Sequence, residues 1–278
     1  MEGTIFFLSQ PNFYTFVFNP SLTKKQIMKK PLFLKLSSIA CLSIISVFQI
    51  NAQNSIGNSN FSDAAKAPRS ISQIDCSTGW SNANEGTADF YHKNAKKCSK
   101  MGIPSNTAGS QEAFSGDGYA GIIAFFDDEA LRSEGNKIVY SNGYNQYSEY
   151  ITTQLSSPLQ AGKKYAVKFR VSLAENSGRA INGLGSYFSK EMIASKSNSF
   201  IKATPQVKSS QVIKAIDKWT EISGNFTATG EEQYITIGLF NGVDKVERAV
   251  PIHVTNNKRA YYYIDGVEVM PSDFADRD

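Results

Sequence analysis

The stretch that decides the fold is Lys164-Tyr-Ala-Val-Lys-Phe-Arg-Val-Ser-Leu173. Apolar residues occupy every second position, and small or polar residues occupy the positions between them. One face carries Tyr165, Val167, Phe169, Val171 and Leu173, and the other carries Ala166, Lys168, Arg170 and Ser172. Because successive side chains of a strand point to opposite sides, this period of two predicts a β-strand with one face in a core and one polar face.

Further short segments of this kind are separated by turn-forming clusters. We predict strands at residues 118–126, 147–155, 184–189, 219–228, 233–240 and 261–270. Helical spacing is weak and occurs only near residues 190–195 and 211–218. Many short strands without long helices between them predict an all-β, antiparallel β-sandwich in a single domain.

Residues 28–52 have the layout of a secretory signal peptide. Met28-Lys29-Lys30 is followed by an apolar run at residues 39–50 and by Asn51-Ala52-Gln53, which predicts cleavage after Ala52. The run has about a dozen residues, too few to span a bilayer core of roughly 30 Å. Residues 1–27 are interpreted as an upstream extension from a start codon assigned too early.

The signal predicts an exported protein in the periplasm, at the cell surface or outside the cell, with no transmembrane span in the mature form. An alternative is a lipid anchor at Cys41, because Ser38-Ile-Ala-Cys41 loosely resembles a lipobox. Residues 53–75 are then a polar lead-in with the first strand, 76–270 the sandwich, and 271–278 an acidic tail.

Charge and histidine content exclude several functional classes. The chain has 29 Lys and Arg against 25 Asp and Glu, but residues 1–52 hold five of the Lys and one acid. The remainder is neutral, which argues against a nucleic-acid binder, because such a protein needs a basic face. Only two His occur, at positions 92 and 253, so His-centred metal sites and triads are not expected.

Export permits a disulfide between Cys76 and Cys98. These residues bracket an Asn- and Gly-rich stretch with little regular structure, and a bridge there would add about 3 kcal/mol in the chain-entropy estimate. The alternative is that both remain free thiols.

The order of several motifs resembles a known family. Trp219-Thr-Glu-Ile-Ser-Gly-Asn-Phe226, Glu232-Gln-Tyr-Ile-Thr-Ile-Gly238 and Tyr262-Tyr-Ile-Asp-Gly-Val267 resemble the C-terminal half of jelly-roll modules related to carbohydrate-binding modules and galactose-binding-like domains. Together with Gly79-Trp80 and Gly116-Asp-Gly-Tyr-Ala-Gly-Ile122, they are similar to a module of exported Bacteroidetes proteins that often precedes an OmpA-like or surface-sorting domain. The resemblance covers roughly residues 58–270, so we expect this chain to be the module alone.

This resemblance implies a jelly-roll fold and a role in binding a glycan or envelope polysaccharide. Aromatic faces and a few polar groups recognise sugars, so the candidate ligand-binding residues are Trp80, Tyr119, Tyr147, Arg170 and Tyr187. Trp80 could instead fill the core, and the polar face of residues 164–173 could be an ordinary solvated face.

The broader class of modules often holds a structural Ca²⁺, for which Asp63 and Asp265 are the candidate ligands here. Ca²⁺ takes six to eight oxygens, and these two residues supply only part of such a set. No cofactor is otherwise required.

Enzymatic motifs are absent from the sequence. There is no Gly-x-Ser-x-Gly elbow and no His-Glu-x-x-His or Cys-x-x-Cys, and Glu149 with Glu175 forms a carboxylate pair without a spacing motif. We therefore expect a non-catalytic carbohydrate-binding-like module. The alternatives are a structural protein docking to an outer-membrane or cell-surface partner, and a polysaccharide-active enzyme on the same frame.

Overall fold

The structure is a computed structural model that describes residues 53–96, 99–126, 130–134, 137–141, 147–248 and 257–274. By its contacts the chain divides into Met1–Gln49 and Ile50–Asp278. The predicted upstream extension, the signal peptide and Cys41 lie outside the described residues.

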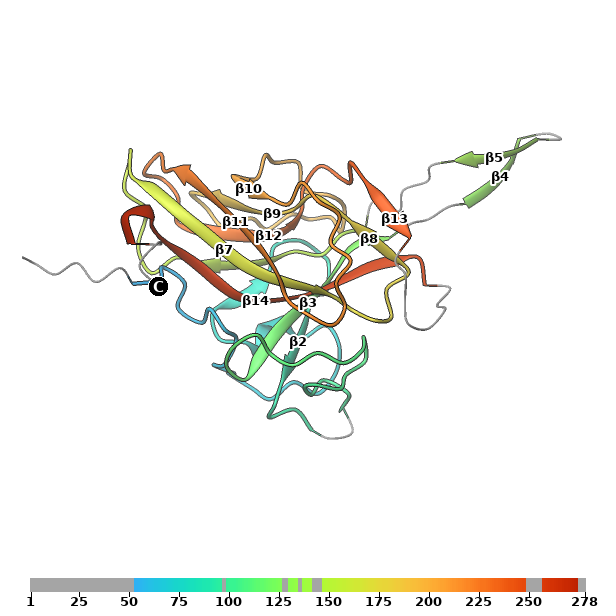
Figure 1. Cartoon of the computed structure of the whole chain (residues 1–278), viewed down its shortest axis with the longest axis horizontal. Helices are drawn as coiled ribbons and strands as arrows, with labels where there is room; N and C mark the ends of the chain where they lie inside the picture. The colour runs from blue at the N-terminus through green and yellow to red at the C-terminus, as the bar shows by residue number, and fades with distance from the viewer. Residues whose placement is uncertain are drawn as a thin grey trace, which may run out of the picture. The chain divides into compact units, whose positions relative to one another are not determined.

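Two five-stranded antiparallel sheets make up the body of the protein (Figure 1). The β6 sheet has the order β1 (Trp80–Asn82), β6 (Ile151–Gln154), β12 (Tyr234–Leu239), β9 (Leu184–Ser189) and β10 (Val207–Lys208). The β7 sheet has the order β11 (Thr220–Thr227), β7 (Lys164–Leu173), β14 (Arg259–Pro271), β3 (Gly118–Phe126) and β2 (Asp89–His92).

Smaller elements complete the fold. Two-stranded ribbons join β8 (Arg179–Ile181) to β13 (Val246–Arg248), and β4 (Ala130–Glu134) to β5 (Lys137–Ser141). Short 3₁₀ turns are η1 (Ile74–Cys76) and η3 (Ser272–Phe274). The all-β, antiparallel jelly-roll sandwich predicted from the sequence is confirmed. Within the part of the chain that the structure describes, no helix has the length and apolar character needed to cross a bilayer.

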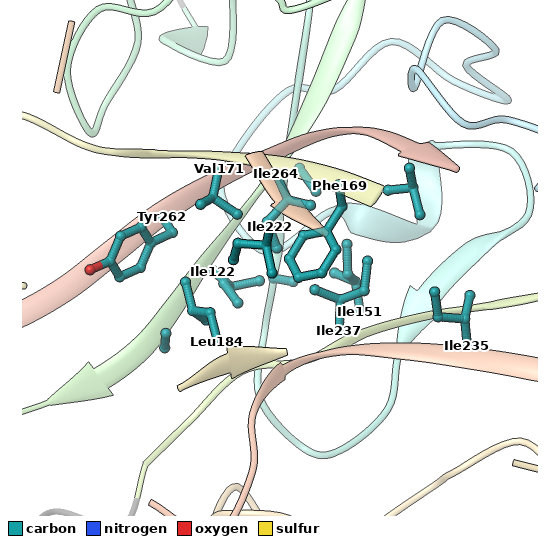
Figure 2. Packing of buried hydrophobic residues seen from close by; sticks show 14 of the residues in the cluster. Ile122, Ile151, Phe169, Val171, Leu184, Ile222, Ile235, Ile237, Tyr262 and Ile264 are labelled. Carbon is teal, nitrogen blue, oxygen red and sulfur yellow. The ribbon is translucent and has the colours of Figure 1, made fainter. Parts of the chain in front are cut away.

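The core lies between the two sheets, as Figure 2 shows. The face of β7 that the alternation predicted to be buried is buried, with Val167, Phe169 and Val171 showing no exposed surface. Phe169, Val171, Ile222 and Ile264 of the β7 sheet meet Ile151, Leu184, Ile235 and Ile237 of the β6 sheet. Burying each of these side chains stabilises the fold by about 1.5–3 kcal/mol, which explains why alternation alone specifies this architecture.

The outer face of the β7 sheet is only partly open to solvent. The segment 99–117, which leads into β3, covers part of it through a second apolar cluster that includes Met101, Tyr119 and Tyr263. Ser172, on the predicted polar face, is therefore fully buried, and its hydroxyl accepts a hydrogen bond from the Gln111 side-chain amide at 3.1 Å. Only the part of this outer face that the covering segment leaves uncovered is open to solvent.

The predicted bridge between Cys76 and Cys98 is not observed. Cys76 is a free thiol that packs in the main core at the end of η1, and Cys98 lies outside the described residues. Backbone hydrogen bonds hold this region instead, from Ile74 N–H to Ala88 O at 3.1 Å and from Ser77 N–H to Ile74 O at 3.0 Å.

Candidate functional site

A hollow of about 320 Å³ opens beside β2, at the edge of the β7 sheet. Four segments outside the strands contribute to it: the turn before η1, the residues just before β2, the middle of the covering segment, and the residues just before β6. Its walls are formed by Ile71, Ser72, Thr87, Asp89, Tyr91, Thr107, Ala108, Ile123, Tyr147, Glu149, Arg259 and Tyr261. The volume is at the lower end of the range for small-molecule sites.

Asp89, the first residue of β2, forms one side of the floor. It is 7% exposed, and its Oδ1 accepts the Ser72 N–H at 2.6 Å. Its Oδ2 accepts the Tyr261 hydroxyl at 2.5 Å and lies 3.4 Å from the Tyr91 hydroxyl oxygen. Burial raises the pKa of this carboxyl, since the charged form loses solvation.

Glu149 forms the other side of the floor. Glu149 bonds to Ile123 of β3, which lies past the first residue of β2. The Glu149 backbone N–H donates to Ile123 O at 2.9 Å, and Glu149 Oε2 accepts the Ile123 N–H at 2.6 Å. Oε1 accepts the Tyr147 hydroxyl at 2.5 Å and the Thr87 hydroxyl at 3.4 Å. Glu149 thus makes the two hydrogen bonds to Ile123 that a neighbouring strand would otherwise make. Burial raises the pKa of Glu149, and the charge of Asp89 raises it further.

Tyrosine hydroxyls connect the floor to the rim. Tyr91 and Tyr261 share a hydrogen bond of 2.8 Å, and Tyr91 also bonds to the Thr107 hydroxyl at 3.1 Å. Gly121 makes this possible, because a Cβ there would overlap the Tyr261 hydroxyl. Burial, reinforced by the charge of Glu149, raises the pKa of Tyr147 to about 12. The phenols therefore stay protonated at physiological pH.

The rim combines apolar and polar groups. Ile71 is 56% exposed, next to the left-handed Ser72 (φ 66°), and Thr87 and Thr107 are also exposed. Half-buried Ile123, Tyr147 and Arg259 form the walls. Exposed apolar carbon beside fixed hydroxyls suits an amphipathic ligand with several hydroxyl groups.

A second hollow of about 310 Å³ lies on the same sheet, over β7 and β11. It is lined by Lys164, Ala166, Val167, Lys168, Ser223, Gly224, Asn225 and Ser272. This lining contains no aromatic side chain, so it offers no flat surface against which a ring could pack.

The structure separates the predicted ligand-binding residues. Trp80 is 3% exposed, stacks on Phe61 with ring centroids 4.8 Å apart, and donates from Nε1 to Asn58 O at 2.9 Å. Tyr119 has no exposed surface and donates its hydroxyl proton to Gln111 O at 2.8 Å. Both predictions need correction: Trp80 belongs to the core, and Tyr119 lies beneath the covering segment.

Arg170 is not available as a free cation. It forms ion pairs with Glu221 at 2.8 Å and with Glu268, and its guanidinium lies 4.6 Å from the centre of the Phe114 ring. Tyr187 lies on the outer face of the β6 sheet, where it packs against Phe240 with ring centroids 5.8 Å apart. Tyr147 is thus the one predicted ligand residue that lines the 320 Å³ hollow.

The structure does not bring the two candidate calcium ligands into a metal site. Asp63 is exposed, and Asp265 is buried and accepts the backbone N–H of Ser115 at 3.1 Å and of Gly266 at 2.6 Å. Among the described residues, no group of three or more His, Cys, Asp or Glu side chains could hold a metal ion. The two aspartates alone do not supply the ligands that Ca²⁺ needs.

Asp89, and not Glu175, shares the hollow with Glu149. Glu175 accepts the Ser110 N–H at 2.8 Å and does not line the hollow, whereas Asp89 does. A usable signal was present: Asp89 with Tyr91, and Tyr147 with Glu149, are acid–aromatic pairs two residues apart, which places each pair on one face of an extended segment. Their convergence could not be inferred, because it depends on strand order.

Comparisons with known proteins return low similarity. No protein-family model matches the sequence, and no curated protein matches it. The CBM22-1 xylan-binding domain from Paenibacillus barcinonensis Xyn10C is 10% identical, with 77% of this chain and 91% of that chain covered and a TM-score of 0.37. A candidate sugar-binding protein from Bacteroides thetaiotaomicron VPI-5482 is 12% identical, with 79% and 100% covered and a TM-score of 0.39.

The K3 cleaved adhesin domain of Lys-gingipain from Porphyromonas gingivalis W83 is 11% identical, with 79% of this chain and 99% of that chain covered and a TM-score of 0.38. Carbohydrate-binding modules, the class that the sequence resembles, are thus among the structural neighbours. At these identities and TM-scores, what the neighbours bind stays a property of those proteins.

Proposed function

We propose that this protein is a non-catalytic carbohydrate-binding module and that the hollow beside β2 is its binding site. The observation that carries the proposal is the shared pocket of Tyr147, Tyr91 and Tyr261 over two buried carboxylates. Fixed hydroxyls on a rigid floor can hydrogen-bond sugar hydroxyls. Ile71 and Ile123 supply apolar surface for the C–H face of a sugar ring.

The size of the hollow favours a short part of a glycan. At about 320 Å³ it has room for one or two sugar units of a longer polymer or for a chain end. The ligand class is therefore a glycan or envelope polysaccharide, bound locally and not along a whole sheet face.

Affinity electrophoresis in gels containing different polysaccharides tests this proposal. We expect at least one polysaccharide to retard the wild type, and Tyr147→Ala to weaken that binding by about tenfold, equivalent to about 1.4 kcal/mol. Tyr187→Ala is the matched control, because Tyr187 is also half-buried but lies on the other sheet. Equal losses in both variants, or no retardation in any gel, would contradict the proposal.

An enzymatic role is the second candidate, because Asp89 and Glu149 are two carboxylates in one pocket, both with raised pKa. Their oxygens already accept several protein hydrogen bonds, which suits a structural role better. Release of reducing ends from a polysaccharide that binds, abolished in Glu149→Gln, would establish the enzyme instead.

We further propose that the protein acts after export, in the periplasm, at the cell surface or outside the cell. The basic and apolar layout of residues 28–52 supports this. Mass spectrometry of the mature form should find Gln53 as its first residue, and a lipid-modified Cys41 at the N-terminus would indicate the anchored alternative.

A further inference from the structure

The threonine and tyrosine hydroxyls of the pocket direct their protons toward the two carboxylates of its floor. We propose that Asp89 and Glu149 set the specificity of the site by holding these hydroxyls as hydrogen-bond acceptors, so that the pocket binds a neutral sugar and rejects an acidic one. The inference rests on the proposed function and adds the class of sugar.

On the Asp89 side, the hydrogen bonds form a chain in which every hydroxyl donates toward Asp89. A phenol has a single proton, and Tyr261 donates its proton to Asp89 Oδ2 at 2.5 Å. In the 2.8 Å bond between Tyr91 and Tyr261, the donor is therefore Tyr91. Tyr91 then accepts from the Thr107 hydroxyl at 3.1 Å. The exposed Thr107 hydroxyl is left with lone pairs to offer a ligand.

On the Glu149 side, the hydroxyls also donate toward a carboxylate, and each does so directly. An ionised carboxylate only accepts hydrogen bonds, so Tyr147 donates to Oε1 at 2.5 Å and Thr87 donates to the same atom at 3.4 Å. Both hydroxyls reach the wall or rim of the pocket. Their lone pairs are likewise available to a ligand.

A neutral sugar complements this arrangement. Its hydroxyls can donate to Thr87, Thr107 and Tyr147, and they can accept from the Arg259 guanidinium and the Ser72 hydroxyl. A uronate or sulfate group has no proton to give. It would face three acceptors and two buried carboxylates, and like charges repel strongly where water is excluded. One guanidinium does not compensate for both carboxylates.

Titration calorimetry at pH 8 tests the inference with three soluble neutral polysaccharides (xylan, glucomannan and mixed-linkage β-glucan) and with two acidic ones (polygalacturonate and alginate). The wild type should bind a neutral polymer and neither acidic one. Glu149→Gln places an amide N–H₂ toward Tyr147 and removes one charge. This variant should bind the neutral polymer about tenfold or more weakly than the wild type does. It should also show a smaller difference in affinity between the neutral and the acidic polysaccharides. Glu232→Gln, a buried carboxylate outside the pocket, is the matched control and should bind like the wild type.

A pH profile separates this role from a purely structural one. Burial raises the pKa of both carboxyls, so on acidification they take up protons at a higher pH than ordinary carboxyls do, and a protonated carboxyl leaves the hydroxyls free to turn. Wild-type binding of the neutral polymer should weaken as the pH is lowered, and the dependence should be smaller in Glu149→Gln. If Glu149→Gln does not fold, Tyr147→Phe removes one oriented hydroxyl, retains the ring and should also weaken neutral binding.

Two results would overturn the inference. One is binding of polygalacturonate at pH 8 that Tyr147→Ala abolishes, which would leave the proposed carbohydrate-binding function intact while reversing the sugar class. The other is an equal loss of neutral binding in Glu149→Gln and Glu232→Gln. Failure of every polymer to bind would instead remove the proposed function, and this inference with it.

Discussion

Gly121 illustrates how a single residue makes room for the site. A Cβ at this position would overlap the Tyr261 hydroxyl and lie 2.8 Å from Tyr91 Cε2. We expect Gly121→Ala to lower the free energy of unfolding by about 2 kcal/mol through overpacking and to abolish binding of any glycan that the wild type binds. Urea unfolding and affinity electrophoresis measure the two effects. Gly57→Ala, where a Cβ meets nothing within 4 Å, should change neither.

Asp265 provides a pH-dependent prediction at the same scale. Burial raises the pKa of its carboxyl to about 7, against an ordinary value of 3.8. The folded state therefore holds this proton more tightly than the unfolded state, and the stability gained below pH 4 is lost as the pH rises through 7.

The test compares urea unfolding of the wild type and Asp265→Asn at pH 5 and pH 8. Relative to the variant, the wild type should lose about 2 kcal/mol between these pH values. Asp89 and Glu149 also have raised pKa values and change the stability with pH in the same direction. Their contribution is the same in both proteins, so it cancels in the comparison. If the free energy of unfolding changes equally in the two proteins between pH 5 and pH 8, Asp265 does not titrate in this range.

At the scale of single elements, alternation predicted strands well where one face enters the core. The predicted segments 118–126 and 184–189 match β3 and β9, and 219–228 matches β11 within one residue at each end. The weakly helical segments 190–195 and 211–218 contain no helix. Their apolar residues, such as Ile193 and Ile213, fill gaps beside the sheets, and this packing has no regular period.

The turn between β11 and β12 depends on one carboxylate. Glu232 is 5% exposed and accepts the N–H groups of Thr229 at 2.8 Å, Gly230 at 2.9 Å and Glu231 at 3.1 Å. Glu232→Ala should lower the free energy of unfolding by about 2 kcal/mol, because three backbone N–H groups of the turn lose a charged acceptor. Urea unfolding measures this loss. Glu231→Ala should have little effect, since the ion pair of Glu231 with Lys190 is exposed, and an equal loss there would show that the turn does not rely on Glu232.

At the scale of the whole molecule, the site could not be predicted because its parts are far apart in sequence. Asp89 and Tyr261 are 172 residues apart, and Ser72 comes from a segment without strand periodicity. Glu149 belongs to the predicted strand 147–155 but lies before the observed strand β6. Strand order brings them together: β14 lies beside β3, and β3 beside β2. The burial of Tyr119 was equally hidden, because a covering loop leaves no mark on the alternation of the strand beneath it.

The N-terminal lead-in joins the two sheets, although its sequence is mostly polar. Asn54 bonds to both Val267 O, at 2.8 Å, and Val269 N–H, at 2.9 Å, on β14 of the β7 sheet. Ile56 then pairs with Leu155, directly after β6, and Phe61 stacks on Trp80 of β1. This segment therefore crosses from one sheet to the other and closes the core between them.

Removal of this segment should therefore unfold the whole sandwich. Ile56 and Phe61 are buried, and losing each costs about 1.5–3 kcal/mol before cavity effects, against a total stability of about 5–15 kcal/mol for an ordinary domain. A chain beginning at Gln53 should show a cooperative urea transition by circular dichroism, and a chain beginning at Ala64 should show none. Asn54→Ala, which loses the two bonds to β14 and the bond from Ile56 N–H to Asn54 Oδ1, should remain folded and be about 2 kcal/mol less stable. A cooperative transition in the shorter chain would mean that the sheets are held together without the lead-in.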